Sequence, residues 1–99
     1  MIIAIIPAYN EERTVSDIVK RTRKYAGEVV VVDDCSSDRT GDMAKKSGAA
    51  VIRHKENRGL GASLHTGFEY ALKKKADMII TLDADGQHNP IHIPKFVKA

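Results

Sequence analysis

Two aspartates, Asp83 and Asp85, follow an apolar run at residues 78–82. A continuous apolar run of this length is typical of a strand buried on both faces. In an extended chain, side chains two residues apart point the same way, so these two carboxylates converge. Converging carboxylates either repel each other or share a cation, and hard oxygen ligands suit Mg²⁺ or Mn²⁺ beside a substrate phosphate. We therefore predict a site for a divalent cation and a phosphate-bearing ligand at this strand end.

Two other cation sites fit this segment less well. An EF-hand loop beginning at Asp83 requires a glutamate at its twelfth position, where the chain has Pro94. A zinc site using His88 and His92 would need a helix that runs across Pro90. The spacing therefore favours the cation shared by two carboxylates.

Three further polar segments follow predicted strands. Residues 7–12, PAYNEE, form a rigid turn whose tyrosine either stacks on a base or is a partly buried loop residue. Of the adjacent Asp33 and Asp34, one can accept a hydrogen bond from a base N–H, because Asp38 is available to cap the next helix. Residues 57–62, NRGLGA, precede a helix whose N-terminus favours anions. Their G-x-G follows the third strand instead of the first, so a dinucleotide-binding fingerprint is not supported.

Strands and helices alternate along the chain. Thr14 is expected to cap the first helix, with Asp17 as its capping-box partner. Apolar strands that alternate with helices pair in parallel through right-handed crossovers. We therefore predict one α/β domain over residues 1–99, a Rossmann-like doubly wound parallel sheet of order 3-2-1-4 with helices on both faces. Every acidic strand end then borders one crevice, where ligands of such sheets bind. The predicted elements are strands at residues 2–6, 28–32, 49–53 and 78–82, helices after residues 14, 38 and 61, and a last helix beginning near Pro90 or Pro94.

The composition restricts the kind of protein. The 99 residues are 42% hydrophobic and 29% charged, which is ordinary for a soluble domain, and no apolar run reaches the ~20 residues of a membrane span. The only cysteine is Cys35, so no internal disulfide is possible. The start resembles a first strand more than a signal peptide, so we expect a cytoplasmic protein. His54 and His65 are expected at the surface.

The net charge of +3 comes partly from basic clusters at residues 20–24 and 73–75. Such clusters on helices are usually solvated faces, and contact with an anionic membrane surface at the cytoplasmic face is the alternative. Nucleic acid is not an expected partner, because aromatic residues are few and do not interleave with the basic ones.

Four ordered motifs carry a family resemblance: IIPAYNEE at residues 5–12, VVDDCSSDRT at 31–40, NRGLGA at 57–62 and LDADGQH at 82–88. In this order they resemble family 2 glycosyltransferases, most closely dolichyl-phosphate mannose or glucose synthases and related polyprenyl-phosphate sugar transferases. The resemblance implies the GT-A fold and an inverting transfer from a GDP- or UDP-sugar, with a polyprenyl phosphate as acceptor.

The resemblance also implies roles for individual residues. The nucleotide pocket is lined by Pro7, Tyr9 and Glu11, and the base is contacted by Val32 and Asp34. The D-x-D segment consists of Asp83, Ala84 and Asp85. The metal, Mg²⁺ or Mn²⁺, lies beside Asp85 and Gln87.

The chain is less than half the usual length of such enzymes, whose later half supplies the general base and the acceptor groove. No catalytic residue is therefore assigned, and a non-catalytic nucleotide-sugar-binding remnant is the first alternative. A phosphoacceptor receiver module would need five strands, with its acid pair after the first of them. A sugar nucleotidyltransferase would need a glycine-rich basic loop after the first strand.

We also expect self-association, because the fourth strand would expose an apolar edge.

Overall fold

The computed structural model describes residues 1–84 and the backbone of residues 91–94. The helices and strands alternate as the sequence predicts, except at the C-terminal end. Their bounds are β1 (Ile2–Ala8), α1 (Val15–Thr22), β2 (Glu28–Asp33), α2 (Thr40–Lys46), β3 (Ala50–Arg53), α3 (Leu60–Lys73), β4 (Met78–Thr81) and β5 (Ile91–Pro94).

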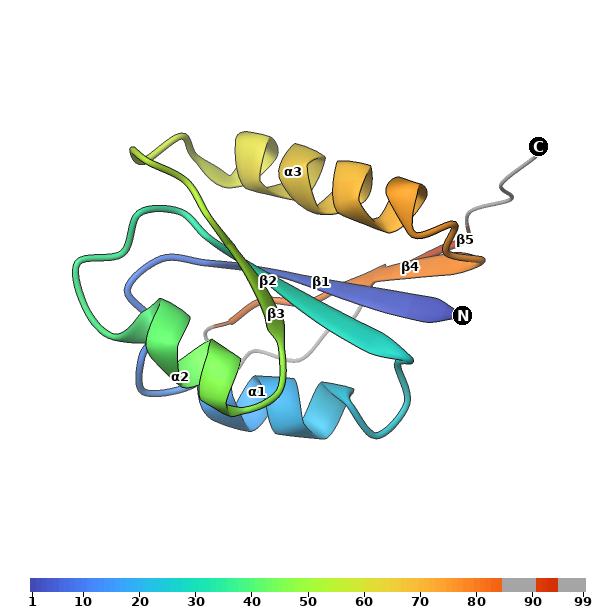
Figure 1. The fold of residues 1–99 in the computed structure, drawn as a ribbon, viewed down its shortest axis with the longest axis horizontal. Helices are drawn as coiled ribbons and strands as arrows, with labels where there is room; N and C mark the ends of the chain where they lie inside the picture. The colour runs from blue at the N-terminus through green and yellow to red at the C-terminus, as the bar shows by residue number, and fades with distance from the viewer. Residues whose placement is uncertain (85–90, 95–99) are drawn as a thin grey trace.

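The strands form one five-stranded sheet of order β3-β2-β1-β4-β5 (Figure 1). The pairs β1–β2, β1–β4 and β2–β3 are parallel, which confirms the predicted order 3-2-1-4. The point at which the winding reverses lies between β1 and β4, where Ile5 is in register with Thr81. The carboxyl ends of these strands therefore lie together, as the sequence predicts.

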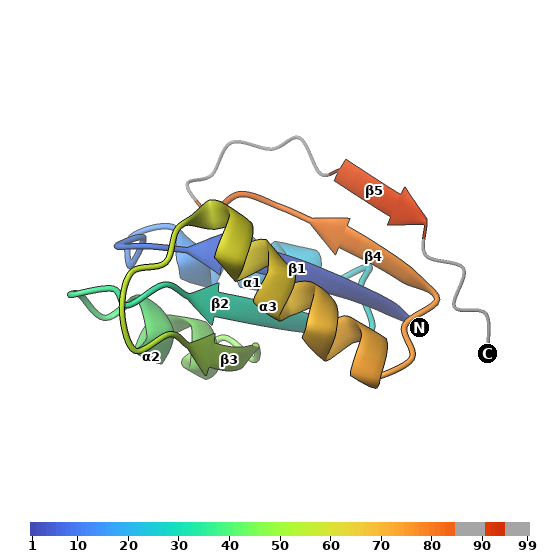
Figure 2. The ribbon, with the colours of Figure 1, turned by 90° about the horizontal axis from the view of Figure 1, so that it is seen from above.

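The prediction of a last helix is wrong for the described residues 91–94. They form β5, which pairs antiparallel with β4, so that Ile79 faces Ile93 and Met78 faces Pro94 (Figure 2). Two β-branched isoleucines favour a strand, and proline is tolerated on a strand at the sheet edge. Because β5 covers the outer edge of β4, the reason given above for self-association does not hold.

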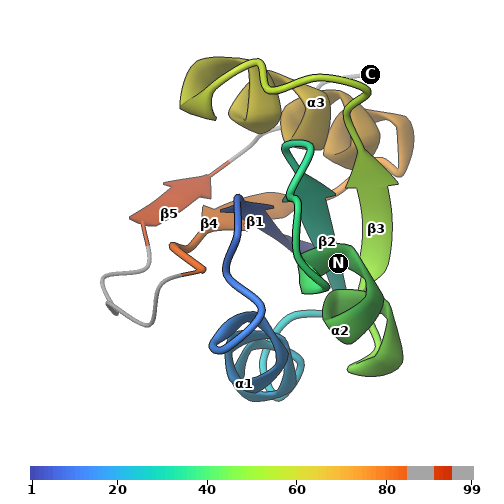
Figure 3. The ribbon, with the colours of Figure 1, turned by 90° about the vertical axis from the view of Figure 1, so that its left-hand side faces the viewer.

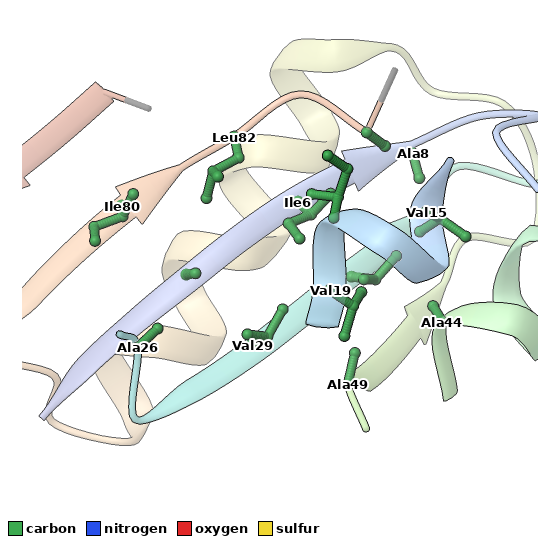
Figure 4. Close-up of a cluster of buried hydrophobic side chains, with 14 residues drawn as sticks. Ile6, Ala8, Val15, Val19, Ala26, Val29, Ala44, Ala49, Ile80 and Leu82 are labelled. Atoms are coloured by element: carbon green, nitrogen blue, oxygen red, sulfur yellow. The ribbon is translucent and has the colours of Figure 1, made fainter. Parts of the chain in front are cut away.

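Helices cover both faces of the sheet, with α3 on one face and α1 and α2 on the other (Figure 1). Successive residues of β1 alternate between the two cores: Ile6 packs in the cluster on the α1 and α2 side (Figure 4), and Ile5 in the cluster on the α3 side. Both side chains are fully buried. The doubly wound arrangement thus follows from strands that are apolar on both faces.

Helix α1 presents one apolar face to the sheet. Val15, Ile18 and Val19 are buried there, at the spacing of an amphipathic helix. Thr14 is the N-cap residue, but its side chain makes no capping hydrogen bond, so the predicted capping box is wrong. The Thr14 hydroxyl instead donates to the backbone carbonyl of Ala84, at the end of the β4 segment.

Helix α3 approaches β1 closely at Gly67. A Cβ atom built on Gly67 would lie less than 3.0 Å from Ile5 Cγ2 and 3.1 Å from both Ile5 Cγ1 and Ile5 Cδ1. The absence of a side chain at this position therefore sets the distance between the helix and the sheet. In the described part of the chain, no helix has the length and apolar character needed to cross a membrane.

Candidate functional site

The loops after β1 and β2 are joined by side chains at the carboxyl end of the sheet, the end that faces the viewer in Figure 3. The backbone N–H of Asn10 donates to Ser36 Oγ at 2.8 Å, and the N–H of Ser37 donates to Asn10 Oδ1 at 2.8 Å. The N–H of Glu11 donates to Thr40 Oγ1, also at 2.8 Å. Asn10 has a φ of +52°, a left-handed conformation that asparagine tolerates better than most residues. These contacts fix the loop that carries Tyr9 and Glu11.

A small pocket of about 130 Å³ lies beside this loop. It brings together three of the predicted nucleotide-binding residues, Pro7, Tyr9 and Asp34, which come from two different strand ends. The Tyr9 side chain is 49% exposed, so its ring is available for stacking. The complete lining is Pro7, Ala8, Tyr9, Asp34, Gly59, Leu60 and Ser63, so the glycine-rich segment before α3 contributes as well.

Two other predicted residues lie outside this lining. Glu11 borders a neighbouring hollow of about 360 Å³, together with Asn10 and Asp38. Val32 is fully buried in the core on the α3 side, in register with Pro7. Its side chain therefore belongs to the core and does not line the pocket.

Asp34 holds the pocket together. Its Oδ1 accepts hydrogen bonds from His54 Nδ1 at 2.7 Å and from the backbone N–H of Arg58 at 2.9 Å. Its Oδ2 accepts one from the backbone N–H of Gly59 at 2.8 Å. Burial alone would raise the pKa of Asp34, but the hydrogen bonds from His54, Arg58 and Gly59 outweigh it and lower this pKa below its ordinary value. The carboxylate is therefore held ionised.

The expectation that His54 is a surface residue is wrong. Its exposure is only 7%, and its ring is held between Asp34 and the hydroxyl of Thr66, 2.8 Å from Nε2. Its place at the carboxyl end of a predicted strand was the one signal in the sequence that could have revealed this role. His65 is exposed, as predicted.

The two adjacent aspartates have different roles. Asp33 is fully buried, accepts a hydrogen bond from the N–H of Ser36 at 2.9 Å and pairs with Arg53 Nη1 at 2.7 Å. Asp38 Oδ1 accepts the N–H of Thr40, the first residue of α2, but the N-cap residue is Arg39, so Asp38 binds the helix start from one position before the predicted cap. Asp34 is thus the carboxylate of this segment that lines the pocket with Tyr9.

The D-x-D segment begins next to the end of β1. The N–H of Leu82 donates to the carbonyl of Ile5 at 3.1 Å, Asp83 is exposed, and Ala84 is buried. The remaining predicted metal-side residues, Asp85 and Gln87, lie outside the described residues. Among the side chains of residues 1–84, no group of three or more His, Cys, Asp or Glu could hold a metal ion.

A larger hollow of about 700 Å³ lies beside α2 and the outer strand β3. Its lining includes Asp33, Lys45 and Arg53, but the first and last of these already pair with each other. It contains none of the residues predicted to bind a nucleotide, so the smaller pocket is the better candidate.

Comparison with known proteins gives one family. Residues 3–99 match the family described as Glycosyl transferase family 2. An uncharacterized protein from Methanocaldococcus jannaschii is 48% identical over 98 residues, which cover 98% of this chain and 40% of that protein. The UDP-N-acetylglucosamine–dolichyl-phosphate N-acetylglucosaminyltransferase of Methanococcus voltae is 32% identical, over 99% of this chain and 46% of that protein. The undecaprenyl-phosphate mannosyltransferase of Micrococcus luteus is 35% identical, over 99% of this chain and 43% of that protein.

Solved structures agree on the fold. The glucosyl-3-phosphoglycerate synthase of Mycobacterium tuberculosis in complex with UDP superposes with a TM-score of 0.71 at 25% identity, covering 86% of this chain and 34% of that one. The same enzyme with Mn²⁺, UDP-glucose and phosphoglyceric acid gives a TM-score of 0.70 at 24% identity, covering 85% and 33%. The chain therefore spans less than half the length of these relatives.

Proposed function

Because the chain belongs to glycosyl transferase family 2, we propose that it binds a nucleotide-diphosphate sugar, a GDP- or UDP-sugar, for inverting transfer to a polyprenyl phosphate. The observation that carries this proposal is the pocket in which Pro7, Tyr9 and Asp34 meet beside the point where the sheet winding reverses. Ligands of open α/β sheets bind at this point. Relatives named as dolichyl- and undecaprenyl-phosphate sugar transferases support the choice of acceptor.

In this proposal each side chain has a separate role. The exposed ring of Tyr9 stacks on the base, and Pro7, which is still within β1, lines the pocket beside it. Asp34 accepts an N–H of the base, for which its ionised state is suited. Glu11 and the backbone at Val32 complete the nucleotide side, and Asp83 faces the ribose. These interactions position the donor and contribute to its binding before transfer.

We assign a divalent cation, Mg²⁺ or Mn²⁺, to Asp85 with Gln87. Carboxylate and amide oxygens are hard ligands, which fit either ion. When bound, such a cation neutralises the charge that develops on the departing diphosphate. Structures of the synthase from Mycobacterium tuberculosis with Mn²⁺ or Mg²⁺ and UDP support a metal in this family. The Thr14 hydroxyl, bonded to the Ala84 carbonyl, holds the start of this segment against α1.

The test is a panel of UDP, GDP, CDP and their sugars, with and without Mn²⁺, read by thermal shift. A ligand that binds only the folded state at about 100 times its Kd adds roughly 2.7 kcal/mol of stability, so a donor will stand out. Asp85→Ala should abolish the Mn²⁺-dependent part of the shift, whereas Asp42→Ala, at an exposed carboxylate on α2, should keep it. Equal Mn²⁺-dependent binding by Asp85→Ala and the unmodified chain would contradict the metal assignment.

A non-catalytic nucleotide-sugar-binding module is the second candidate, because the roles assigned above concern binding of the donor and its metal and include no general base for the acceptor. It differs from the enzyme only in turnover. Release of nucleoside diphosphate that depends on an added polyprenyl phosphate distinguishes the two. We do not favour a receiver module, because Asp33 is paired with Arg53 and Asp34 already accepts three hydrogen bonds.

We place the protein in the cytoplasm, at the cytoplasmic face of the membrane that holds its acceptor. The exposed basic residues at the ends of α1 and α3, among them Lys24 and Lys73, are suited to anionic lipid. Cosedimentation with vesicles that contain anionic lipid, but not with neutral vesicles, is the expected result. Equal recovery with both kinds of vesicle would contradict this placement.

A further inference from the structure

The hydrogen bonds of Asp34 restrict which base the pocket can accept. An ionised carboxylate has about four acceptor positions. Three are filled by donors from the chain itself: His54 Nδ1 and the N–H of Arg58 on Oδ1, and the N–H of Gly59 on Oδ2. One position on Oδ2 is left, and Asp34 lines the pocket.

The filled positions cannot easily be released to a ligand. Two of the donors are backbone N–H groups, in a turn where Gly59 has a φ of +93°. The third, His54, is 7% exposed and is held from its other side by Thr66. Freeing His54 Nδ1 would leave a buried donor without a partner, which is unfavourable.

Two of the neighbouring carbonyls already accept hydrogen bonds from the chain. The Gly59 carbonyl already accepts hydrogen bonds from the backbone N–H and the hydroxyl of Ser63, at 3.1 and 3.0 Å. The Ala8 carbonyl accepts the N–H of Asp34 at 2.9 Å. Of the seven residues that line the pocket, Asp34 alone carries a carboxylate. Asp34 is therefore the only ionised acceptor among the residues that line the pocket.

Bases differ in the number of donors that they present to such an acceptor. Uracil has a single ring N–H between two carbonyl groups. Guanine presents a ring N–H and an adjacent amino group, so one acceptor leaves its second donor unpaired. Cytosine and adenine place a ring nitrogen lone pair beside their amino group, and that lone pair would face the negative charge of Asp34.

We infer that the base is uracil and that the donor is a UDP-sugar. This inference rests on the proposed function and narrows it. The pocket volume of about 130 Å³ is below the roughly 300–1,000 Å³ that enclose a whole drug-sized ligand, so the pocket receives one part of the donor. Tyr9 then stacks on the pyrimidine ring while Asp34 accepts the N3–H.

Isothermal titration of the 99-residue chain in Mn²⁺ with four diphosphates tests the acceptor count. UDP and GDP compare the two bases. Inosine diphosphate keeps the ring N–H of guanine but lacks the amino group, and N3-methyluridine diphosphate lacks the one donor of uracil. An unpaired buried donor should weaken binding by about fivefold or more. We therefore expect UDP to bind more tightly than GDP, inosine diphosphate more tightly than GDP, and the N3-methyl compound more weakly than UDP, each by at least this factor.

The contrary results are equally specific. If GDP binds as tightly as UDP, or as tightly as inosine diphosphate, the amino group has found an acceptor and the inference is wrong, although the proposed function stands. Equal binding of UDP and its N3-methyl derivative overturns the role of Asp34 in reading the base. If no diphosphate binds, the proposed function fails together with the inference.

Discussion

Replacing Gly67 by alanine should destabilise the protein even though alanine is the better helix former. Gly67 lies in the middle of α3, and its Cβ would meet Cγ1, Cγ2 and Cδ1 of Ile5, a residue that is fully buried on β1. Glycine to alanine in a helix interior gains about 1 kcal/mol. Inserting a methyl group into a packed core costs about 1–3 kcal/mol. The expected net loss is therefore about 1 kcal/mol in the free energy of unfolding.

Gly61 provides the matched control in the same helix. A Cβ on Gly61 meets nothing within 4 Å, so Gly61→Ala should stabilise the protein, by up to about 1 kcal/mol. Urea unfolding measures both variants, with an unchanged slope m as the sign that only stability has changed. Ile5→Ala removes all three obstructing atoms, so in that background Gly67→Ala should become stabilising. A Gly67→Ala variant as stable as Gly61→Ala would refute the close packing of α3 on β1.

Three further predictions concern the site. Asp34→Asn should lower the free energy of unfolding in urea by about 1–3 kcal/mol, because the NH₂ group of the asparagine must face a donor such as the N–H of Arg58. Unchanged stability would contradict the hydrogen bonds assigned to Asp34. The pKa values of Asp34 and Asp38 lie below the ordinary 3.8, since hydrogen bonds outweigh the raising effect of burial. The stabilisation that these two ionised carboxylates give the folded protein is therefore complete above pH 3.8, and it is lost as the pH falls through their lower pKa values in the folded state. The Tm should drop steeply below about pH 4, and less steeply in the Asp38→Asn variant. Thr14→Val leaves the Ala84 carbonyl without its hydroxyl donor and should weaken only the Mn²⁺-dependent part of UDP affinity, roughly 2- to 10-fold by titration; an equal loss without Mn²⁺ would show a different role.

The sheet order and the position of the pocket could be predicted because they depend on patterns along the chain. Apolar strands alternating with helices leave few right-handed arrangements, and the ends of parallel strands then meet. The sequence therefore predicts that the strand ends that carry Tyr9 and Asp34 meet at one edge of the sheet, and the two residues line one pocket there.

Other features depend on contacts that no local pattern contains. β5 is a short strand with a proline, and pairing with Met78 and Ile79 decides its conformation. His54 is buried because Asp34, 20 residues away, provides a partner for its ring. Thr14 has the sequence of a helix cap, yet its hydroxyl bonds to Ala84, 70 residues away. In each case a long-range partner overrides the local preference.

The Asp34 carboxylate also bears on the order in which the chain folds. Its three donors come from residues 20, 24 and 25 positions further along, and the histidine among them is held by Thr66 of α3. Such contacts form only after the intervening loop has closed, at an entropic cost that grows with its length. The base pocket therefore takes its final shape only once β3 and the first turns of α3 have docked. A partly synthesised chain that ends before Thr66 would have the loop with Tyr9 but no finished receptor for a nucleotide.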